Sequence, residues 1–392
     1  MGESLGQDTI VFSLFLIFTG AAVLATLALF ARQALPVAYI VLGVLIGPYG
    51  AGLIVEPTAI RAMAEVGIMF LLFLLGLDLA PAGLVNMLRK ATLVTIGSSL
   101  AFASAGFGVA VVFGFSVEEG IFVGAATMFS STIIGLKLLP TTALHHQRLG
   151  EIIISILLLQ DIIAIALLLV IEGLGEQGTW TSMVLSLLSL PALLVASYLF
   201  ARNVLIPLIR RFDKIREYIF LTAIGWCLGV AQVAHMIGLS HEIGAFAAGV
   251  MLATSPIALY IADSLKPLRD FFLVLFFFSL GAGFDLQVLQ QVLLPALVLA
   301  ALMMVMKPWV FRGLLTLSGE KSGASMEVGV RLGQISEFSL LIAVLALEQQ
   351  IVSHGASYLI QSATLLTFVA STYYVVMVYP TPVAISDRLR RD

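Results

Sequence analysis

The sequence predicts an all-α polytopic membrane protein with about thirteen transmembrane helices, arranged as two inverted six-helix repeats with crossed broken helices. Of its 392 residues, 60% are hydrophobic and 11% are charged, and the mean hydropathy is +1.09. Soluble domains carry about 25% charged residues, so this composition excludes a soluble globular protein. The apolar segments run roughly 17–25 residues, the length that a helix needs to cross a bilayer.

The charges between the apolar segments predict how the chain is oriented. Lys and Arg gather in one set of loops, as in RNVLIPLIRRFDKIR (202–216), whereas the opposite loops hold mainly acids. The positive-inside rule then places the N-terminus outside and the C-terminus in the cytoplasm, in a cytoplasmic (inner) membrane. The predicted spans begin near Thr9, Pro36, Ile60, Ala91, Val117, Leu149, Trp180, Ile215, His241, Pro267, Gln287, Ser325 and Gly355.

Two pairs of similar segments predict an internal repeat. VLGVLIG (41–47) resembles AAGVMLA (247–253), and LLFLLGLDL (71–79) resembles LFFFSLGAGFDL (275–286), with offsets of 206 and 207 residues. This offset equals seven spans, an odd number, so the two copies face opposite ways, as in secondary transporters. The predicted domains are a first repeat (1–175, spans one to six), a linker span with a basic loop (176–214), a second repeat (215–386) and a basic cytoplasmic tail (387–392).

One predicted span in each repeat is interrupted by polar residues. ATMFSSTIIGLKLLP (126–140) and VGVRLGQISEFSLLIAV (328–344) are the two interrupted segments. For either one alone, it is as plausible that Ser and Thr bond back to their own helix. Their matched positions favour two broken helices that cross, since unwound backbone is tolerated in a membrane only where protein or water satisfies it. The polar residues expected to line the crossing are Ser130, Ser131, Thr132, Ser336 and Glu337.

The span LLLQDIIAIALLLV (157–170) contains an acid, Asp161, next to Gln160. An aspartate at the centre of a spanning helix costs roughly 2.5–3.5 kcal/mol on insertion scales, so such residues are usually functional. A buried carboxylate can hold a proton or a monovalent cation but not both, and this competition is sufficient for antiport. Gln160 adds a neutral oxygen, so a K+ or Na+ site is predicted at Asp161 and Gln160.

Two basic residues also lie within predicted spans. We expect Lys307 to pair with Asp161 or Glu337 or to titrate itself, and Arg331 to find its partner on another helix. The alternative is a structural ion network that holds the bundle together. A Walker loop, zinc-ligand spacing and a nucleophile elbow are absent from the sequence, so we expect a secondary active transporter, not an enzyme, with no cofactor beyond the transported ions and no nucleic-acid partner.

These residues lie in segments that resemble the Kef-type branch of the second monovalent cation–proton antiporter family. The resemblance covers nearly the whole chain and follows the order of the family's motifs. It is carried by EVGIMFLLFLLGLDL (65–79), SSTIIGLKLL (130–139), LLLQDIIAIALL (157–168), GLSHEIGAFAAGVMLA (238–253), PLRDFFLVLFFFSLGAGFDL (267–286) and GQISEFSLLIAVLA (333–346).

The resemblance implies thirteen helices in a dimerisation domain and a mobile core domain, working as a homodimer by an elevator-like motion. It implies that Asp161 is the ion-binding acid, that Gln160 marks the potassium-transporting branch, and that Lys307 pairs with the acid. Kef-type proteins usually continue into a cytosolic nucleotide-binding domain. The present sequence stops after SDRLRRD without this regulatory domain, which leaves gating by nucleotide or glutathione open.

The function expected from the sequence is potassium/proton exchange through Asp161. Sodium/proton exchange is the nearest alternative. A gated potassium efflux channel could use the same polar crossing. A membrane sensor or anchor subunit without transport is the third alternative, against which the paired broken helices argue.

Overall fold

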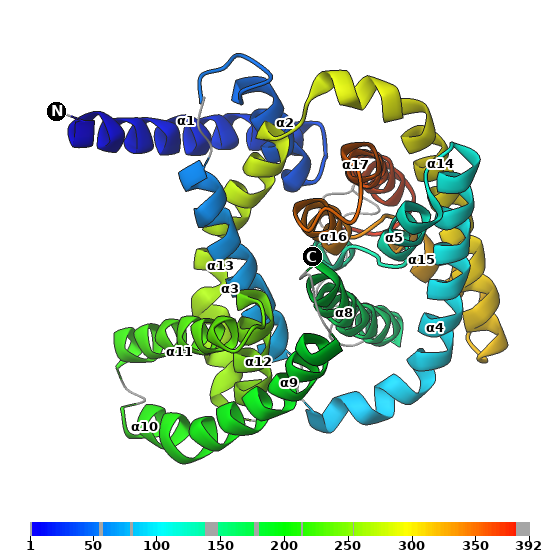
Figure 1. The fold of residues 1–392 in the computed structure, drawn as a ribbon. Coiled ribbons are helices and arrows are strands. Elements are labelled where there is room, and N and C mark those ends of the chain that lie inside the picture. Colours follow the sequence, from blue (N-terminus) through cyan, green and yellow to red (C-terminus); the bar gives the residue numbers. More distant parts are fainter. Residues whose placement is uncertain are drawn as a thin grey trace. The chain divides into compact units, whose positions relative to one another are not determined.

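A computed structural model describes residues 2–54, 58–78, 81–137, 148–175, 180–212, 215–253 and 255–381, which are helical almost throughout (Figure 1). The predicted tail, 387–392, lies outside the described residues. The helices are α1 (Gly2–Phe30), α2 (Leu35–Ile46), α3 (Thr58–Asp78), α4 (Pro81–Val112), α5 (Val117–Thr127), α6 (Thr132–Lys137), α8 (Arg148–Gly175), α9 (Trp180–Phe200), the π-helix η1 (Ala201–Leu205), α10 (Ile206–Arg211), α11 (Arg216–Met236), α12 (His241–Ala253), α13 (Ile257–Ala282), α14 (Leu286–Leu317), α15 (Ser322–Arg331), α16 (Glu337–Glu348) and α17 (His354–Val378).

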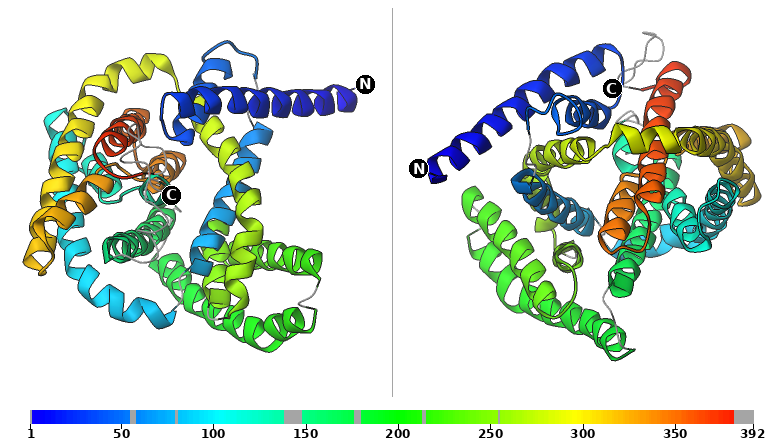
Figure 2. Two further views of the ribbon diagram at one scale, coloured as in Figure 1. Left: turned by 180° about the vertical axis from the view of Figure 1, so that it is seen from behind. Right: turned by 45° about the horizontal axis from the view of Figure 1, so that its top comes forward.

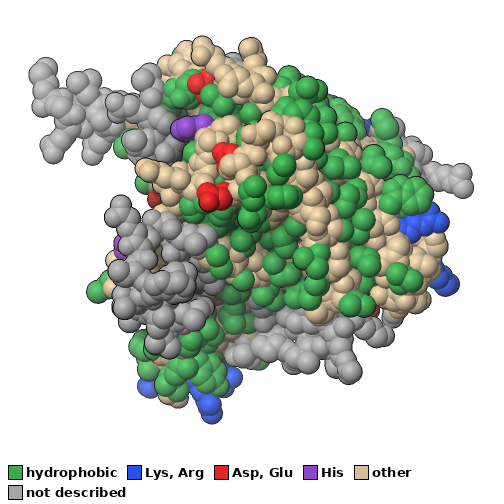
Figure 3. Space-filling view, turned by 45° about the vertical axis from the view of Figure 1, so that its right-hand side comes forward, with side chains coloured by type: hydrophobic (Ala, Val, Ile, Leu, Met, Phe, Trp, Pro, Cys, Tyr) green, Lys and Arg blue, Asp and Glu red, His purple; other side chains and the backbone are tan. Residues whose placement is uncertain are grey.

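Several helices are long and apolar enough to cross a membrane, which confirms a polytopic helical membrane protein. Hydrophobic side chains dominate the face shown in Figure 3, and few charged side chains interrupt it. Such a surface is stable in lipid and would aggregate in water. Within the described residues, the seven candidate spans are 10–30, 91–112, 149–168, 191–211, 216–236, 287–317 and 354–378.

Helix α13 begins at Ile257 and runs through Pro267, near which the sequence predicts the start of a span. Charged residues near Pro267 are paired on the helix surface: Lys266 with Asp263 at 2.6 Å, and Arg269 with Asp270 at 2.8 Å. A helix can therefore continue through this charged segment, because these side chains reach solvent while the backbone remains helical.

The chain divides into two compact units, each built from several separate segments. The first unit contains Met1–Val23, Tyr39–Leu84 and Glu176–Gly283. The second unit contains Leu24–Ala38, Val85–Gly175 and Phe284–Asp392.

In the first unit, α2 and α13 approach closely enough that glycine is required on both helices. A Cβ atom on Gly43 would overlap the carbonyl oxygen of Phe278, and one on Gly281 would overlap that of Ile40. Without side chains at these two positions, the backbones themselves are in contact, a packing mode common in membrane helices.

A second contact of the same kind joins α3 and α12. A Cβ atom on Gly249 would overlap the carbonyl oxygen of Phe73, and one on Gly76 would lie 2.5 Å from that of Phe246. Figures 1 and 2 show α12 beside α3 in this unit. Each contact thus pairs one helix from the first half of the chain with one from the second half.

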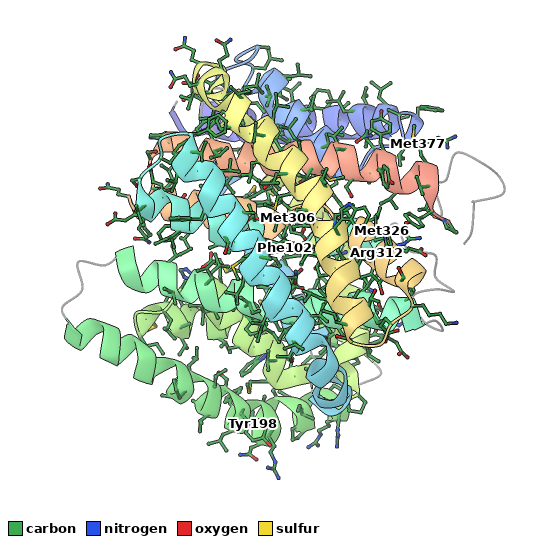
Figure 4. The ribbon with its side chains drawn as sticks, turned by 90° about the vertical axis from the view of Figure 1, so that its right-hand side faces the viewer. Phe102, Tyr198, Met306, Arg312, Met326 and Met377 are labelled. Atoms are coloured by element: carbon green, nitrogen blue, oxygen red, sulfur yellow. The ribbon has the colours of Figure 1, made fainter. Side chains whose placement is uncertain are left out.

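In the second unit, α4 and α14 lie on the outer side of α5, α8, α16 and α17 (Figures 1 and 2). Phe102 of α4 and Phe311 of α14 pack edge to face, with ring centroids 5.4 Å apart. Figure 4 labels Phe102 on α4 and Met306 on α14. Helix α14 contains Pro295 and Pro308, each of which removes one backbone hydrogen bond and favours bending.

The α3–α12 contact predicts a strong effect of a single methyl group. Gly249→Ala should lower the free energy of unfolding by about 1–3 kcal/mol, because the backbones of α3 and α12 must separate. Gly229→Ala in α11 is the matched control, since a Cβ there meets nothing within 4 Å, and its stability should be unchanged or slightly raised. Thermal unfolding in detergent measures both; equal midpoints for the two variants would contradict close packing at Gly249.

Candidate functional site

The first interruption of helical structure lies between α5 and α6. Helix α5 ends at Thr127, and α6 begins at Thr132. The hydroxyl of Thr127 bonds to the carbonyls of Gly124, at 2.7 Å, and Phe102, at 2.9 Å. Ser131 Oγ accepts a hydrogen bond from the Ile134 amide at 3.1 Å, so a serine begins the second half-helix in the manner of an N-cap.

The second interruption lies between α15 and α16. Helix α15 ends at Arg331, and α16 begins at Glu337, capped by Ser336, whose Oγ accepts from the Phe338 amide at 3.1 Å. The unwound residues between them are buried, including Gln334 and Ile335. Their backbone groups therefore need partners from other parts of the protein.

Hydrogen bonds join the two interruptions directly. Ser130 Oγ donates to the carbonyl of Leu332 at 2.8 Å, and Ser339 Oγ donates to the carbonyl of Ala126 at 2.5 Å. Ser130 thus bonds to the end of α15, and Ser339 bonds to the end of α5. The structure thus brings Ser130, Ser131, Ser336 and the residues around them into one buried region.

Gln160 of α8 holds the first interruption in place. Its side chain is fully buried; Oε1 accepts from the Ser130 amide at 3.0 Å, and Nε2 donates to the carbonyl of Met128 at 3.1 Å. Both polar atoms of the carboxamide therefore bond to backbone groups of residues that follow the end of α5. The neighbouring Asp161 is therefore held at a fixed position relative to the unwound segment.

Asp161 lies midway along α8, and its side chain is only 2% exposed. Thr132 Oγ1 donates to its carboxylate, at 3.2 Å from the nearer oxygen. Glu337, at the start of α16, lies close enough for the two carboxyl groups to interact electrostatically. A carboxylate beside a hydroxyl oxygen offers the ligand chemistry that hard cations prefer, and it can also take a proton.

Lys307 of α14 is fully buried, and it bonds to the residues that follow the ends of α5 and α15. Its Nζ donates to the carbonyl of Phe129 at 2.6 Å, to the carbonyl of Gln334 at 3.0 Å and to Ser130 Oγ at 3.3 Å. It also lies over the ring of Phe102, 5.2 Å from the centroid. A cation is favourable where helices end in free carbonyls. An ion pair between Lys307 and Asp161 or Glu337 stays a prediction.

Arg331 has different partners from those the sequence suggested. It pairs with Glu327, four residues earlier on α15, at 2.8 Å, and donates to the carbonyl of Pro380 at 2.9 Å. Its guanidinium also lies over the ring of Tyr379. The sequence predicted a partner on another helix. For the pair with Glu327 this prediction was wrong, because Glu327 precedes Arg331 by four residues on α15 and this spacing brings two side chains of one helix together.

Sequence reasoning missed the contribution of α17. Ser371 Oγ donates to Gln334 Oε1 at 2.8 Å, and Thr367 Oγ1 accepts from the Ile335 amide at 3.0 Å. Gln334 Nε2 reaches the carbonyl of Ser131 at 3.4 Å. The available signal was a polar face at helical spacing within an apolar span, formed by Ser357, Gln361, Thr364, Thr367 and Ser371.

Residues 14–379 match the family described as "Sodium/hydrogen exchanger, transmembrane". The chain belongs to the sodium/hydrogen exchanger family. This is a family of secondary transporters and not of enzymes, and the match extends over both interruptions, Asp161 and Lys307.

Curated relatives of this exchanger-family chain include two plant proteins and one bacterial protein. K(+) efflux antiporter 4 of Arabidopsis thaliana is 31% identical over 358 residues, which cover 87% of this chain and 59% of the relative. K(+) efflux antiporter 6 of the same plant is 30% identical over 369 residues, 92% of this chain and 62% of the relative. The "Iron transporter MagA" of Paramagnetospirillum magneticum is 27% identical over 348 residues, which cover 88% of this chain and 80% of the relative.

These comparisons confirm the resemblance to the Kef-type monovalent cation/proton antiporters, for the membrane domain. The chain spans about three-fifths of the length of the two plant relatives, 59% and 62%.

The contacts of Lys307 predict that this exchanger-family chain depends on it for stability. Lys307→Met should lower the free energy of unfolding by about 2–4 kcal/mol, because the carbonyls of Phe129 and Gln334 lose a charged donor. Lys266→Met is the matched control; Lys266 forms an exposed pair with Asp263 and should contribute less than about 1 kcal/mol. Thermal unfolding in detergent compares them, and similar midpoints would show that these carbonyls do not depend on Lys307.

Proposed function

We propose that the chain exchanges K+ for H+ across a cytoplasmic membrane by alternating access, with Asp161 holding the cation and the proton in turn. The single observation that carries this proposal is the position of Asp161: it is buried, contacted by Thr132, and coupled electrostatically to Glu337 at the two interruptions. A buried anion without a counter-ion is costly, so the site should be stable when either a cation or a proton neutralises it.

The other site residues take different roles in this proposal. Thr132 would contribute a hydroxyl oxygen to the cation, and Glu337 would add negative charge or carry a proton. Gln160, Ser130, Ser131 and Ser336 would shape the site, since the hydrogen bonds described above hold them to backbone groups. No cofactor other than the transported ions is proposed.

The choice of K+ rests on Gln160 and on the relatives. The two plant proteins are named K(+) efflux antiporters, and Gln160 precedes the acid as in the potassium-transporting branch. The name of the family favours a second candidate, sodium/proton exchange at the same residues.

We further propose that the membrane fold has thirteen spans in two inverted repeats, 1–175 and 215–386, separated by the linker 176–214. Close helix contacts support this. Gly249 follows Gly43 by 206 residues, and Gly281 follows Gly76 by 205 residues. The two backbone contacts, α2 with α13 and α12 with α3, therefore use equivalent positions of the two repeats.

The interrupted helices support the same repeat. The carbonyls of Ala126 and Leu332, 206 residues apart, each accept a hydrogen bond from a serine of the other interrupted segment. The capping residues Ser131 and Ser336 are 205 residues apart. In the thirteen-span count, α5 with α6, and α15 with α16, each cross the membrane as one broken span.

The proposed transport cycle moves the second unit as one body, because this unit contains both interruptions, Asp161 and Lys307. We propose that the chain forms a homodimer, with the N-terminus outside and the C-terminus in the cytoplasm. The segregation of Lys and Arg to alternate loops supports this orientation.

Removal of one charge tests the proposal. In proteoliposomes, a K+ gradient should drive proton movement through the unmodified protein, and Asp161→Asn should reduce it to the level of protein-free vesicles. Asp263→Asn, the same change at an exposed aspartate, should stay within about twofold of the unmodified rate.

Three outcomes of this experiment separate the candidate functions. Unchanged exchange in Asp161→Asn would overturn the role of Asp161. Proton movement driven by Na+ and not by K+ would favour sodium/proton exchange. Rapid K+ flux without proton movement would favour a channel.

A further inference from the structure

Helix α17 presents a polar face toward the interior of the second unit. Its members, spaced by four, three, three and four residues, lie on one side of the helix and are at most 7% exposed. We call these residues the α17 polar face: Ser357, Gln361, Thr364, Thr367 and Ser371. A buried polar face of this extent is costly in a membrane helix unless each group has a partner.

Two members of this face contact the unwound segment between α15 and α16. Thr367 Oγ1 accepts from the Ile335 amide at 3.0 Å and donates to the carbonyl of Thr364 at 2.8 Å. Ser371 Oγ donates to Gln334 Oε1 at 2.8 Å. The first contact holds the backbone of the unwound segment, and the second orients the Gln334 carboxamide.

Gln334 contacts residues at both interruptions. Its Nε2 faces the carbonyl of Ser131, at 3.4 Å, and its backbone carbonyl accepts from Lys307 at 3.0 Å. The next residues along the chain are the cap Ser336 and the acid Glu337. Thr367 and Ser371 themselves have no described contact with Asp161, so they act on the site only through the unwound segment.

We propose that Thr367 and Ser371 are positioning residues that set the affinity and selectivity of the cation site. This inference rests on the proposed cation/proton exchange at Asp161. A cation is bound by several oxygens at defined separations, so loosening one interruption weakens cation binding and reduces the discrimination between K+ and Na+. Proton binding needs only the Asp161 carboxylate and is less sensitive to such loosening.

Isosteric replacement of Thr367 tests the proposal. Thr367→Val keeps the side-chain shape and removes the acceptor for the Ile335 amide. We expect the apparent KM for K+ to rise roughly tenfold, the size of effect that a lost buried hydrogen bond can produce, with a change in kcat of less than about twofold. The ratio of K+ to Na+ exchange should fall, and Ser371→Ala should act in the same direction.

Two further variants separate positioning from general stability. Thr364→Val makes the same change one turn earlier, where the only described partner of the hydroxyl is the carbonyl of Ile360 on its own helix, and it should leave KM and selectivity unchanged. Thr367→Ser retains a hydroxyl and should restore the KM of the unmodified protein. Equal KM and selectivity values in Thr367→Val and Thr364→Val would overturn the proposal.

Hydrogen–deuterium exchange gives a readout that does not depend on transport. Thr367→Val should speed exchange of the Ile335 amide and its neighbours, whereas Thr364→Val should not; equal exchange in the two variants would overturn the positioning role. Asp161→Asn distinguishes this failure from failure of the proposed function. If that variant is inactive while Thr367→Val matches its control, the exchange function stands and only the positioning inference fails.

Discussion

Unwound backbone in the interior of a membrane protein must find a partner for every polar group, and this constraint governs the second unit. At the first interruption, Gln160 uses both ends of its carboxamide on the backbone of Met128 and Ser130. At the ends of α5 and α15, Lys307 supplies a charged donor to two carbonyls. Without such partners, each unsatisfied backbone group would cost several kcal/mol in a lipid environment. The interruptions are therefore stable only together with the side chains that bond to them.

The same constraint separates the charges of the site. Lys307 lies where the first half-helices end in carbonyls, and Asp161 lies where Thr132 begins the next half-helix. Helix ends have opposite partial charges, so the cationic and the anionic side chain each occupy a favourable position. In the proposed exchange, the Asp161 carboxylate binds a cation and a proton in turn.

Packing differs between the two units in a way that fits their proposed roles. In the first unit, glycines let the backbones of α2 and α13, and those of α3 and α12, come into direct contact. In the second unit, α17 supplies hydroxyl groups to the unwound segment, so that its stability depends on individual hydrogen bonds. Hydrogen bonds of this kind can be rearranged at a lower cost than backbone packing.

The sequence alone determined the membrane class, the interrupted segments and the acid, because apolar length, small polar residues and a charge within a span are local properties. It also indicated the repeat offset through Gly43 and Gly249. It did not determine the partners of Lys307 or the contribution of Thr367 and Ser371. Those depend on contacts between residues up to 178 positions apart, such as Lys307 with Phe129. Only the tertiary structure decides which carbonyl lies within reach of a buried ammonium group, because each side chain has several chemically suitable partners in the sequence.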